Sequence, residues 1–487
     1  MEESIKKAIK SFGLFVFALI LSLNLTSNAF AYIIVDGDGS AGNPYKISTC
    51  AQLHSWINDA PGTTLTYVNF LITNNLDCTG YTFNNTTTLI HSTIDGGNHR
   101  IKNINIGESG FIYILDSSKI KNLYLESGNN DGALYFYAGS FASQMINNSE
   151  LNNVKSSLTL KCDGFCGGLV AIAQDSTITN SVYDGEITTA GSYSGGLVGS
   201  SISNKTQNLN ISRSAFLGKM SSYSYAGGLI GSHAINVNIV DSYVNATLFF
   251  GPYSGGMIGA FNDGITINKS YTDGVDSLDT HSGGMIGGYN SNIVAMHSYV
   301  ALNSSAYGPN LGHVMGYGNS GVIFSDIKYL DNSGTGRCES GNPSSVSGCS
   351  PMTTSEMDLV PSIMGFDLTN TWQQDIGKQP TLRLTDFSDP TVLPNTGDIN
   401  IETVKDTVIS KKYIPDGWSY ANAGVVSVVN TSSQSNTQND NPINNQPKNQ
   451  QTEVKDTSND NTLYISVLSI VAVVSLGILI NKFRPKK

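Results

Sequence analysis

The chain has 487 residues, of which 13% are charged and 50 are glycine, and its formal net charge at pH 7 is −11. Binding to nucleic-acid phosphates requires a basic surface, so this composition argues against a nucleic-acid partner. Gly, Asn, Ser and Thr are abundant while long runs of good helix formers are scarce, which favours β-structure with many turns over a helical fold.

The N-terminus has the three parts of a secretory signal peptide. Basic residues precede an apolar run from residue 12 to residue 25, and Ala29 and Ala31 are the small residues that signal peptidase reads. We therefore expect residues 1–31 to be a signal peptide and the mature chain to begin near Tyr32. An uncleaved membrane anchor is the alternative, which the short apolar run disfavours.

Six cysteines fit the oxidising environment outside the cell. The simplest hypothesis joins nearest neighbours along the chain. A metal site is the rival interpretation, but the cysteines lack paired C-x-x-C spacing and a nearby histidine. The expected pairs are Cys50 with Cys78, Cys162 with Cys166, and Cys338 with Cys349.

A seven-residue phrase, written YSGGMIG at Tyr253, recurs through the middle of the chain. Clear copies are spaced by 28, 32, 28 and 28 residues, and weaker copies lie 28 residues upstream and 29 residues downstream. Fixed periods of this size indicate a repeat architecture. The first glycines of the copies are Gly139, Gly167, Gly195, Gly227, Gly255, Gly283 and Gly312. A second marker runs in phase, each serine followed within two residues by Tyr or Phe: Ser181, Ser214, Ser242, Ser270 and Ser298.

These units hold short β-prone runs separated by Gly and Asn turns. A unit of 28 residues can form one coil of a parallel β-helix, whereas a propeller blade needs about 40. We therefore predict an all-β fold, a right-handed parallel β-helix of about eight coils. Residues 32–92 are its N-terminal cap, residues 93–335 its repeats and residues 336–390 its closing segment.

Each position in such a coil stacks on its counterpart about 4.8 Å away, so like must stack on like. The residues two places after the marker glycines are all apolar, as an inward ladder requires. We expect the glycine pair before them to turn a corner with positive φ. The predicted inward residues are Phe141, Leu169, Leu197, Leu229, Met257, Met285 and Val314.

The recurring GGLVG with SY between copies resembles the GLUG-motif repeats of bacterial surface proteins. GDGSAGNPYKISTCAQL is similar to the first segment of such proteins, and LITNNLDCTG and TIDGGNHRIKNI to their first coils. MTTSEMDLVPSIMGFDLTNTWQQDIGKQPTLR is similar to their closing segment, with Phe366, Trp372 and Pro380 in the usual order. The resemblance covers residues 36 to 383. It implies a β-helix and an exported location, and such repeats accompany several functions, adhesion and peptidase partners among them.

The C-terminal part has a different character. Residues 391–462 are largely polar, with almost only Asn, Gln, Ser, Thr, Asp and Lys near the end, which predicts a disordered linker. Residues 463–480 form an apolar run just long enough to cross a bilayer. The basic tail at 481–487 should stay in the cytoplasm, which places the repeats outside the cell. The membrane is therefore a predicted partner, through this single C-terminal span.

A possible sorting signal interrupts the linker. The stretch Leu393, Pro394, Asn395, Thr396 and Gly397 resembles the motif by which sortases attach proteins to cell walls. In that family the motif directly precedes the apolar span, whereas 65 residues, 398 to 462, intervene here. The order is right and the spacing differs, so use of the motif stays open.

One column of rings is the best candidate binding site. A ring lies two residues before each of six successive marker glycines, at Tyr137, Phe165, Tyr193, Tyr225, Tyr253 and His281. Stacked rings would form a platform for a sugar or a partner protein. The alternative is a ladder that only stabilises adjacent coils.

A catalytic constellation is harder to find. The best carboxylate cluster is Asp263, Asp273, Asp276 and Asp279, but Asp before Gly is an ordinary turn pair. We predict that the protein binds no cofactor and no metal and has no enzymatic activity. The prediction is an exported, membrane-anchored surface protein that binds a glycan, an envelope component or another cell-surface protein. The alternatives are a polysaccharide-degrading enzyme, which carboxylates facing across one groove would favour, and a structural spacer.

Overall fold

The computed structural model describes residues 35–387, with gaps at 59–62, 84–86, 108–109, 131–134, 190, 202–207, 303–310, 335, 341–345, 376 and 385–386. All of these belong to the first of two compact units, Met1–Val429. The predicted signal peptide, the Leu393–Gly397 motif, the apolar run at 463–480 and the basic tail lie outside the described residues. Within the described part, no helix is long and apolar enough to span a membrane.

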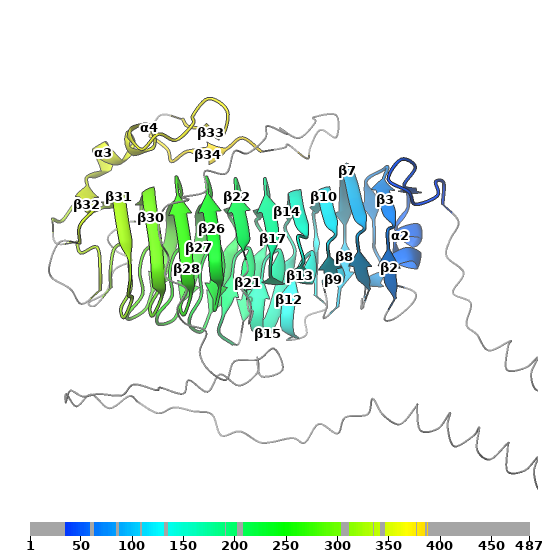
Figure 1. The fold of residues 1–487 in the computed structure, drawn as a ribbon, viewed down its shortest axis with the longest axis horizontal. Coiled ribbons are helices and arrows are strands. Elements are labelled where there is room, and N and C mark those ends of the chain that lie inside the picture. Colours follow the sequence, from blue (N-terminus) through cyan, green and yellow to red (C-terminus); the bar gives the residue numbers. More distant parts are fainter. Residues whose placement is uncertain are drawn as a thin grey trace, which may run out of the picture. The chain divides into compact units, whose positions relative to one another are not determined.

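The repeats form a parallel β-solenoid of about nine turns, which confirms the predicted all-β coil (Figure 1). A 25-stranded sheet runs along the solenoid as one row of parallel strands and a second row that bends around a corner, so that a single coil supplies up to three of its strands. A 7-stranded sheet forms a third row. The handedness of the coil stays a prediction.

The first row begins near the N-terminus and ends at the last coil. It consists of β1 (Tyr45–Ile47), β3 (Asn69–Ile72), β7 (Thr93–Lys102), β10 (Lys119–Leu125), β14 (Glu150–Ser156), β17 (Ser176–Thr179), β22 (Leu209–Ser212), β26 (Ile235–Val240), β28 (Asp263–Asn268), β30 (Ser291–Val300), β31 (Ile323–Leu330) and β32 (Cys349–Met352). The second row consists of β4 (Leu76–Asp77), β5 (Thr82–Phe83), β8 (Ile104–Ile106), β11 (Gly128–Asn129), β12 (Tyr135–Gly139), β15 (Thr159–Gly167), β18 (Val182–Tyr183), β19 (Glu186–Thr189), β20 (Ser194–Gly195), β23 (Ala215–Phe216), β24 (Lys219–Ser222), β27 (Tyr243–Phe250) and β29 (Tyr271–Leu278).

The third row is the 7-stranded sheet: β2 (Thr64–Thr66), β6 (Thr88–Ile90), β9 (Ile112–Asp116), β13 (Ala142–Ile146), β16 (Val170–Ala173), β21 (Val198–Ser200) and β25 (Ile230–Ser232). Its line continues through single bridges, Ile230 with Ile258 and Ile258 with Ile286. At the N-terminal end lies α2 (Cys50–Ile57), whose first turn is closed by a capping box between Thr49 and Gln52.

The register predicted from the repeat is confirmed. Each coil forms one rung of the solenoid, and the marker glycines of neighbouring rungs pair with each other, for example Gly227 with Gly255 and Gly255 with Gly283. Every residue two places after a marker is fully buried. Their backbone groups form a continuous ladder, in which the N–H of Leu229 donates to the carbonyl of Met257 over 2.8 Å. The recurring phrase therefore fills the same core position on each turn.

The predicted reason for the glycine pair is wrong. Neither glycine of the pair has positive φ. Glycine is required instead because there is no room: a Cβ on Gly195 would lie 1.9 Å from the carbonyl oxygen of Val198, and one on Gly196 would lie 2.1 Å from that of Gly228. Positive φ falls on the ring residue two positions before the pair, with 76° at Tyr193, 55° at Tyr225, 62° at Tyr253 and 63° at His281.

The second marker is a buried serine ladder. The N–H of Ser214 donates to Oγ of Ser242 over 3.2 Å, and the N–H of Ser242 donates to Oγ of Ser270 over 3.1 Å. Each hydroxyl in turn donates to the carbonyl two residues before it, as Ser242 does to Val240. The ladder satisfies backbone N–H groups at a corner where strand pairing is interrupted, so its role is structural.

After β32 the chain turns back along the solenoid. Residues 353–387, here called the strap, contain α3 (Thr354–Met357), α4 (Val360–Ile363) and the antiparallel pair β33 (Trp372–Gln373) and β34 (Thr381–Leu382). Figure 1 shows these elements along one edge of the solenoid. The segment predicted to close the helix therefore lies beside the coils for much of its length.

The strap covers a second stack of rings. Tyr243, Tyr271 and Tyr299 stack with centroids 5.0 and 4.9 Å apart. The ring of Trp372 lies against the first two of them, and its Nε1 donates to Oδ1 of Asp241 over 3.1 Å. Because Tyr271, Tyr299 and Trp372 are all fully buried, the strap closes an apolar surface that the coils alone would leave open.

Polar contacts place the end of the strap near the N-terminal coils. The hydroxyl of Tyr299 donates to Oε1 of Gln379 over 2.7 Å, whereas Arg100 donates through Nε and a terminal nitrogen to the carbonyl of Phe387, each over 2.9 Å. The ring of Phe387 lies 5.7 Å from that of Tyr124. Strand pairing puts Tyr124 six rungs from Tyr299, so the strap spans most of the repeat region.

Candidate functional site: a double aromatic column

The predicted column of rings forms a continuous stack. Neighbouring centroids lie 5.0 to 5.9 Å apart and the planes of neighbouring rings differ by 9° to 21°. This is the offset-stacked arrangement that aromatic pairs prefer. The first column, in rung order, is Tyr137, Phe165, Tyr193, Tyr225, Tyr253 and His281.

A second column stands beside the first, and sequence reasoning missed it. It consists of His233, Phe261, Tyr289 and Tyr317. The first three rings stack at 5.4 and 5.5 Å, and Tyr317 closes the column edge-on at 6.2 Å. The signal was present, because a ring follows four successive marker glycines by five or six residues.

Cross-contacts join the two columns. Tyr193 lies 5.2 Å from His233, Tyr253 lies 5.0 Å from Tyr289, and the remaining pairs are equally close. In each pair the second ring comes from the next coil along the chain. The two columns therefore form one unit, here called the double column, in which every ring from Tyr193 onward touches at least two others.

Exposure differs along the double column. Phe165 is fully buried, while Tyr193, Tyr225 and Tyr253 are half-buried. Tyr289 and Tyr317 are 41% and 47% exposed, and the adjacent Tyr223 is 74% exposed. Because stacking covers the ring faces within each column, ring edges and phenol hydroxyls are what the solvent meets.

The phenol hydroxyls are close enough to affect one another. Burial raises the pKa of Tyr225, and the nearby hydroxyls of Tyr289 and Tyr223 raise it further. Burial, followed by the hydroxyls of Tyr253 and Tyr317, raises the pKa of Tyr289 to about 12. Both of these hydroxyls are therefore protonated at neutral pH, so they are uncharged and can donate hydrogen bonds.

One ring makes the double column sensitive to acid. Burial lowers the pKa of His233 to about 4, below its usual value of about 6.5. The unfolded chain then binds a proton at this histidine more readily than the folded chain does, so protonation favours unfolding. The contribution of neutral His233 to the free energy of unfolding is therefore complete above about pH 6.5 and is lost as the pH falls toward about 4. His233→Phe keeps a stacked ring, so we expect it to reduce the loss of stability between pH 7 and pH 5 by about 1–2 kcal/mol. Urea unfolding at both pH values measures this, and an unchanged difference between them would contradict it.

The three predicted carboxylates whose side chains the structure describes make separate local contacts. Asp263 in β28 accepts hydrogen bonds from the hydroxyl of Ser291 and the amide of Asn292, both at 2.7 Å. Asp273 accepts from the N–H of Gly274, which has positive φ, and both residues lie within β29 where its register with β27 shifts, so the pair predicted as a turn forms a strand irregularity. The Asp279 carboxylate caps the next N–H, and the side chain of Asp276 is outside what the structure describes. Among the described residues no three His, Cys, Asp or Glu side chains gather as metal ligands would.

The predicted disulfides are confirmed. The bonds are Cys50–Cys78, Cys162–Cys166 and Cys338–Cys349. The first joins α2 to the start of the coils. The second closes a short loop around Phe165 at the beginning of the first column, so it fixes the backbone that carries this ring. The third ties the last coil to β32.

Comparison with known proteins identifies no family. No family model matches the chain, and no curated protein matches it. Among solved structures, a "putative immunoglobulin A1 protease" from Bacteroides ovatus is 13% identical with a TM-score of 0.33, over 72% of this chain and 95% of that one. An "IgA1 Protease" is 16% identical with a TM-score of 0.41, over 71% of this chain and 25% of that one. This chain thus spans a quarter of the second protein, and the similarity to GLUG-motif repeats remains a resemblance in sequence.

Proposed function

We propose that the protein is exported, anchored at the membrane, and displays the β-solenoid for binding at the cell surface. The observation that supports a binding role is the gathering of exposed tyrosines on one edge, Tyr223, Tyr289 and Tyr317 beside the half-buried rings. Tyrosine combines an apolar ring with a polar tip, and it is favoured at protein interfaces. The partner is a component of the envelope, a glycan or another cell.

Rigidity also supports this role. The double column rests on a close-packed core, and each of its rings is held by neighbours on adjacent coils. A surface whose side chains are already ordered loses little conformational entropy when it binds. Stacked coils thus present a prearranged recognition surface without a mobile loop.

The double mutant Tyr289→Ala/Tyr317→Ala tests the proposal. Both rings are nearly half exposed, so we expect adhesion to fall roughly tenfold, the loss typical of a central interface residue, while the melting temperature falls less than in Tyr225→Ala, whose ring is more buried. The measurement is binding of cells displaying the full chain to a panel of matrices and cells, with a melting curve of each variant. Tyr67→Ala is the control, since Tyr67 is 70% exposed and belongs to the N-terminal coils.

A purely structural ladder predicts the reverse. In that case the double mutant lowers the melting temperature and leaves adhesion of the folded protein unchanged. Tyr225→Ala separates the roles less cleanly, because Tyr225 touches Tyr193, Tyr253 and Phe261 and its loss should cost stability under either role.

A further inference from the structure

We propose that the double column binds a proline-rich segment in the polyproline II conformation, lying along the solenoid axis. This inference rests on the binding role proposed above and names its partner. Three properties of the surface lead to it: the direction of its repeat, the groups that it exposes, and the coverage of its ring faces.

The repeat of the surface runs along the solenoid axis. Tyr193, Tyr225 and Tyr253 lie on successive rungs, which parallel strands space about 4.8 Å apart. A ligand that contacts equivalent hydroxyls must therefore be a linear chain parallel to the axis. A compact ligand would touch only one or two rungs.

The length of one polyproline II turn matches two rungs. Three residues at about 3.1 Å give a turn of roughly 9.3 Å, against about 9.6 Å for two rungs. A peptide in β-conformation presents the same face every two residues, about 6.7 Å, which fits neither one rung nor two. A polyproline II segment therefore stays in register with the double column, and a β-strand does not.

The exposed groups are complementary to such a chain. A polyproline II backbone has no internal hydrogen bonds, and proline has no N–H, so the chain offers mainly carbonyl acceptors. The double column offers the phenol hydroxyls of Tyr225 and Tyr317 as donors, whereas those of Tyr253 and Tyr289 hydrogen-bond to each other and leave one free proton between them. The raised pKa values of Tyr225 and Tyr289 keep these two hydroxyls protonated.

The faces of the rings argue against the simplest sugar platform. A sugar packs its apolar face on an open ring face, but here the faces within each column contact the next ring at 5.0 to 5.9 Å. Apart from the rings of Tyr317 and Tyr223, which are not stacked face to face in the columns, what remains open is a line of ring edges and hydroxyls. A glycan is therefore the competing ligand in the experiment and not the one proposed.

Titration of the full chain with labelled oligoprolines of about three, six, nine and twelve residues tests the proposal. The hydroxyls from Tyr193 to Tyr317 extend over about four rungs, or about 19 Å, which about six polyproline II residues cover, so we expect affinity to rise until roughly six residues and then level off. Gly-Ser peptides of equal length and cello- and chito-oligosaccharides are titrated in parallel. Fluorescence anisotropy of the probe gives each dissociation constant.

Removing single hydroxyls sharpens the test. Tyr225→Phe and Tyr289→Phe keep the rings and the stacking, and each should weaken oligoproline binding about three- to tenfold by deleting one hydrogen bond. Tyr67→Phe, far along the chain and stacked on His91, should change nothing. Tyr271→Phe, whose hydroxyl donates to the carbonyl of Pro380 beneath the strap, should lower stability without affecting binding.

The outcomes separate this inference from the proposed function. Equal binding of Gly-Ser peptides, or oligoproline binding that ignores both Tyr→Phe changes, overturns the polyproline II ligand. The polyproline II ligand is also overturned if the oligosaccharides bind, if their affinity falls in the Tyr→Phe variants, and if the oligoprolines do not bind. That result would leave the surface-binding role intact. Unchanged cell adhesion of the Tyr289→Ala/Tyr317→Ala protein overturns that role itself.

Discussion

Leu229→Asp is expected to unfold the middle of the solenoid. Leu229 is fully buried, and its backbone lies between those of Leu197 and Met257 in the inward ladder. An unpaired carboxylate at this position costs several kcal/mol, because a buried charge without a partner keeps neither its hydration nor a hydrogen bond. In a stack of coils that contact only their neighbours, the damage should begin locally.

Hydrogen exchange and urea unfolding measure the effect. Protection should be lost first in β25, which begins at residue 230, and in its partner β21 on the preceding coil, and later in the N-terminal coils. Leu217→Asp is the matched control, since Leu217 is 38% exposed and a new carboxylate there remains hydrated. Uniform protection and an unchanged midpoint in the Leu229 variant would refute the register.

Trp372→Ala should release the strap. Trp372 is fully buried against Tyr243, Tyr271 and Phe366, and truncating a buried tryptophan to alanine typically costs about 3–5 kcal/mol. The loss also leaves Asp241 without the indole N–H that it accepts. Because the strap contributes few strands of its own, we expect it to detach while the coils stay folded.

Limited proteolysis followed by mass spectrometry detects this detachment. Cleavage should appear within residues 353–387 of the variant under conditions that leave the wild type intact, and unfolding should separate into two transitions. Leu359→Ala provides the comparison within the strap, because Leu359 is 61% exposed and its loss should have little effect. A single, unshifted transition in the Trp372 variant would show that the strap does not depend on this residue.

The repeat period made the register predictable. Since each rung places the same position in the same environment, the apolar residues after the markers could be assigned inward without coordinates, and the structure confirms them. The first column followed from the same logic. The second column was missed because it begins only at the fourth marker and shifts by one residue at Tyr317.

Backbone conformation and non-repeating contacts were harder to predict. Glycine adopts positive φ most readily, so residue type alone favoured the glycines. In the structure Tyr193 and Tyr225 adopt it instead, and the prediction is wrong. The strap carries no period, and its partners lie far away in sequence: Arg100 contacts Phe387, 287 residues later. Nothing in the pattern of either segment indicates the other.

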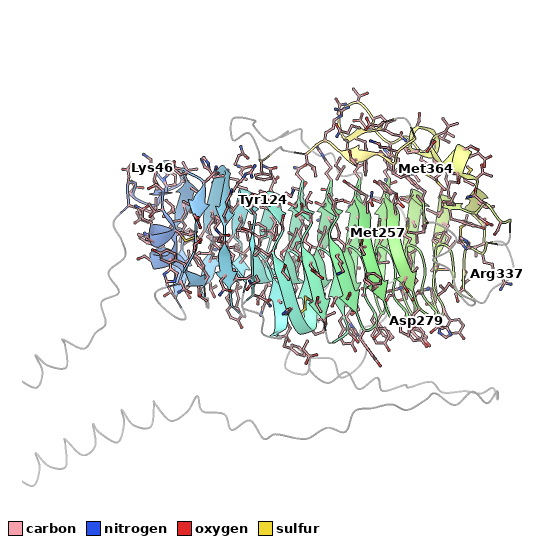
Figure 2. All side chains as sticks on the ribbon, turned by 180° about the vertical axis from the view of Figure 1, so that it is seen from behind. Lys46, Tyr124, Met257, Asp279, Arg337 and Met364 are labelled. Carbon is pink, nitrogen blue, oxygen red and sulfur yellow. A yellow bond between two sulfur atoms is a disulfide. The ribbon has the colours of Figure 1, made fainter. Side chains whose placement is uncertain are left out.

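The path of the strap has a mechanical consequence. Figure 2 shows Met364 of the strap on one edge of the solenoid and Asp279, two residues before His281 of the double column, on the opposite edge. A load applied between a ligand on the double column and the chain beyond Phe387 therefore has a large component across the coils. The inter-rung hydrogen bonds run along the axis, so covalent backbone carries that transverse component within each coil. The remaining axial component is shared by the contacts of the strap, which are distributed along the coils from Tyr299 to Arg100.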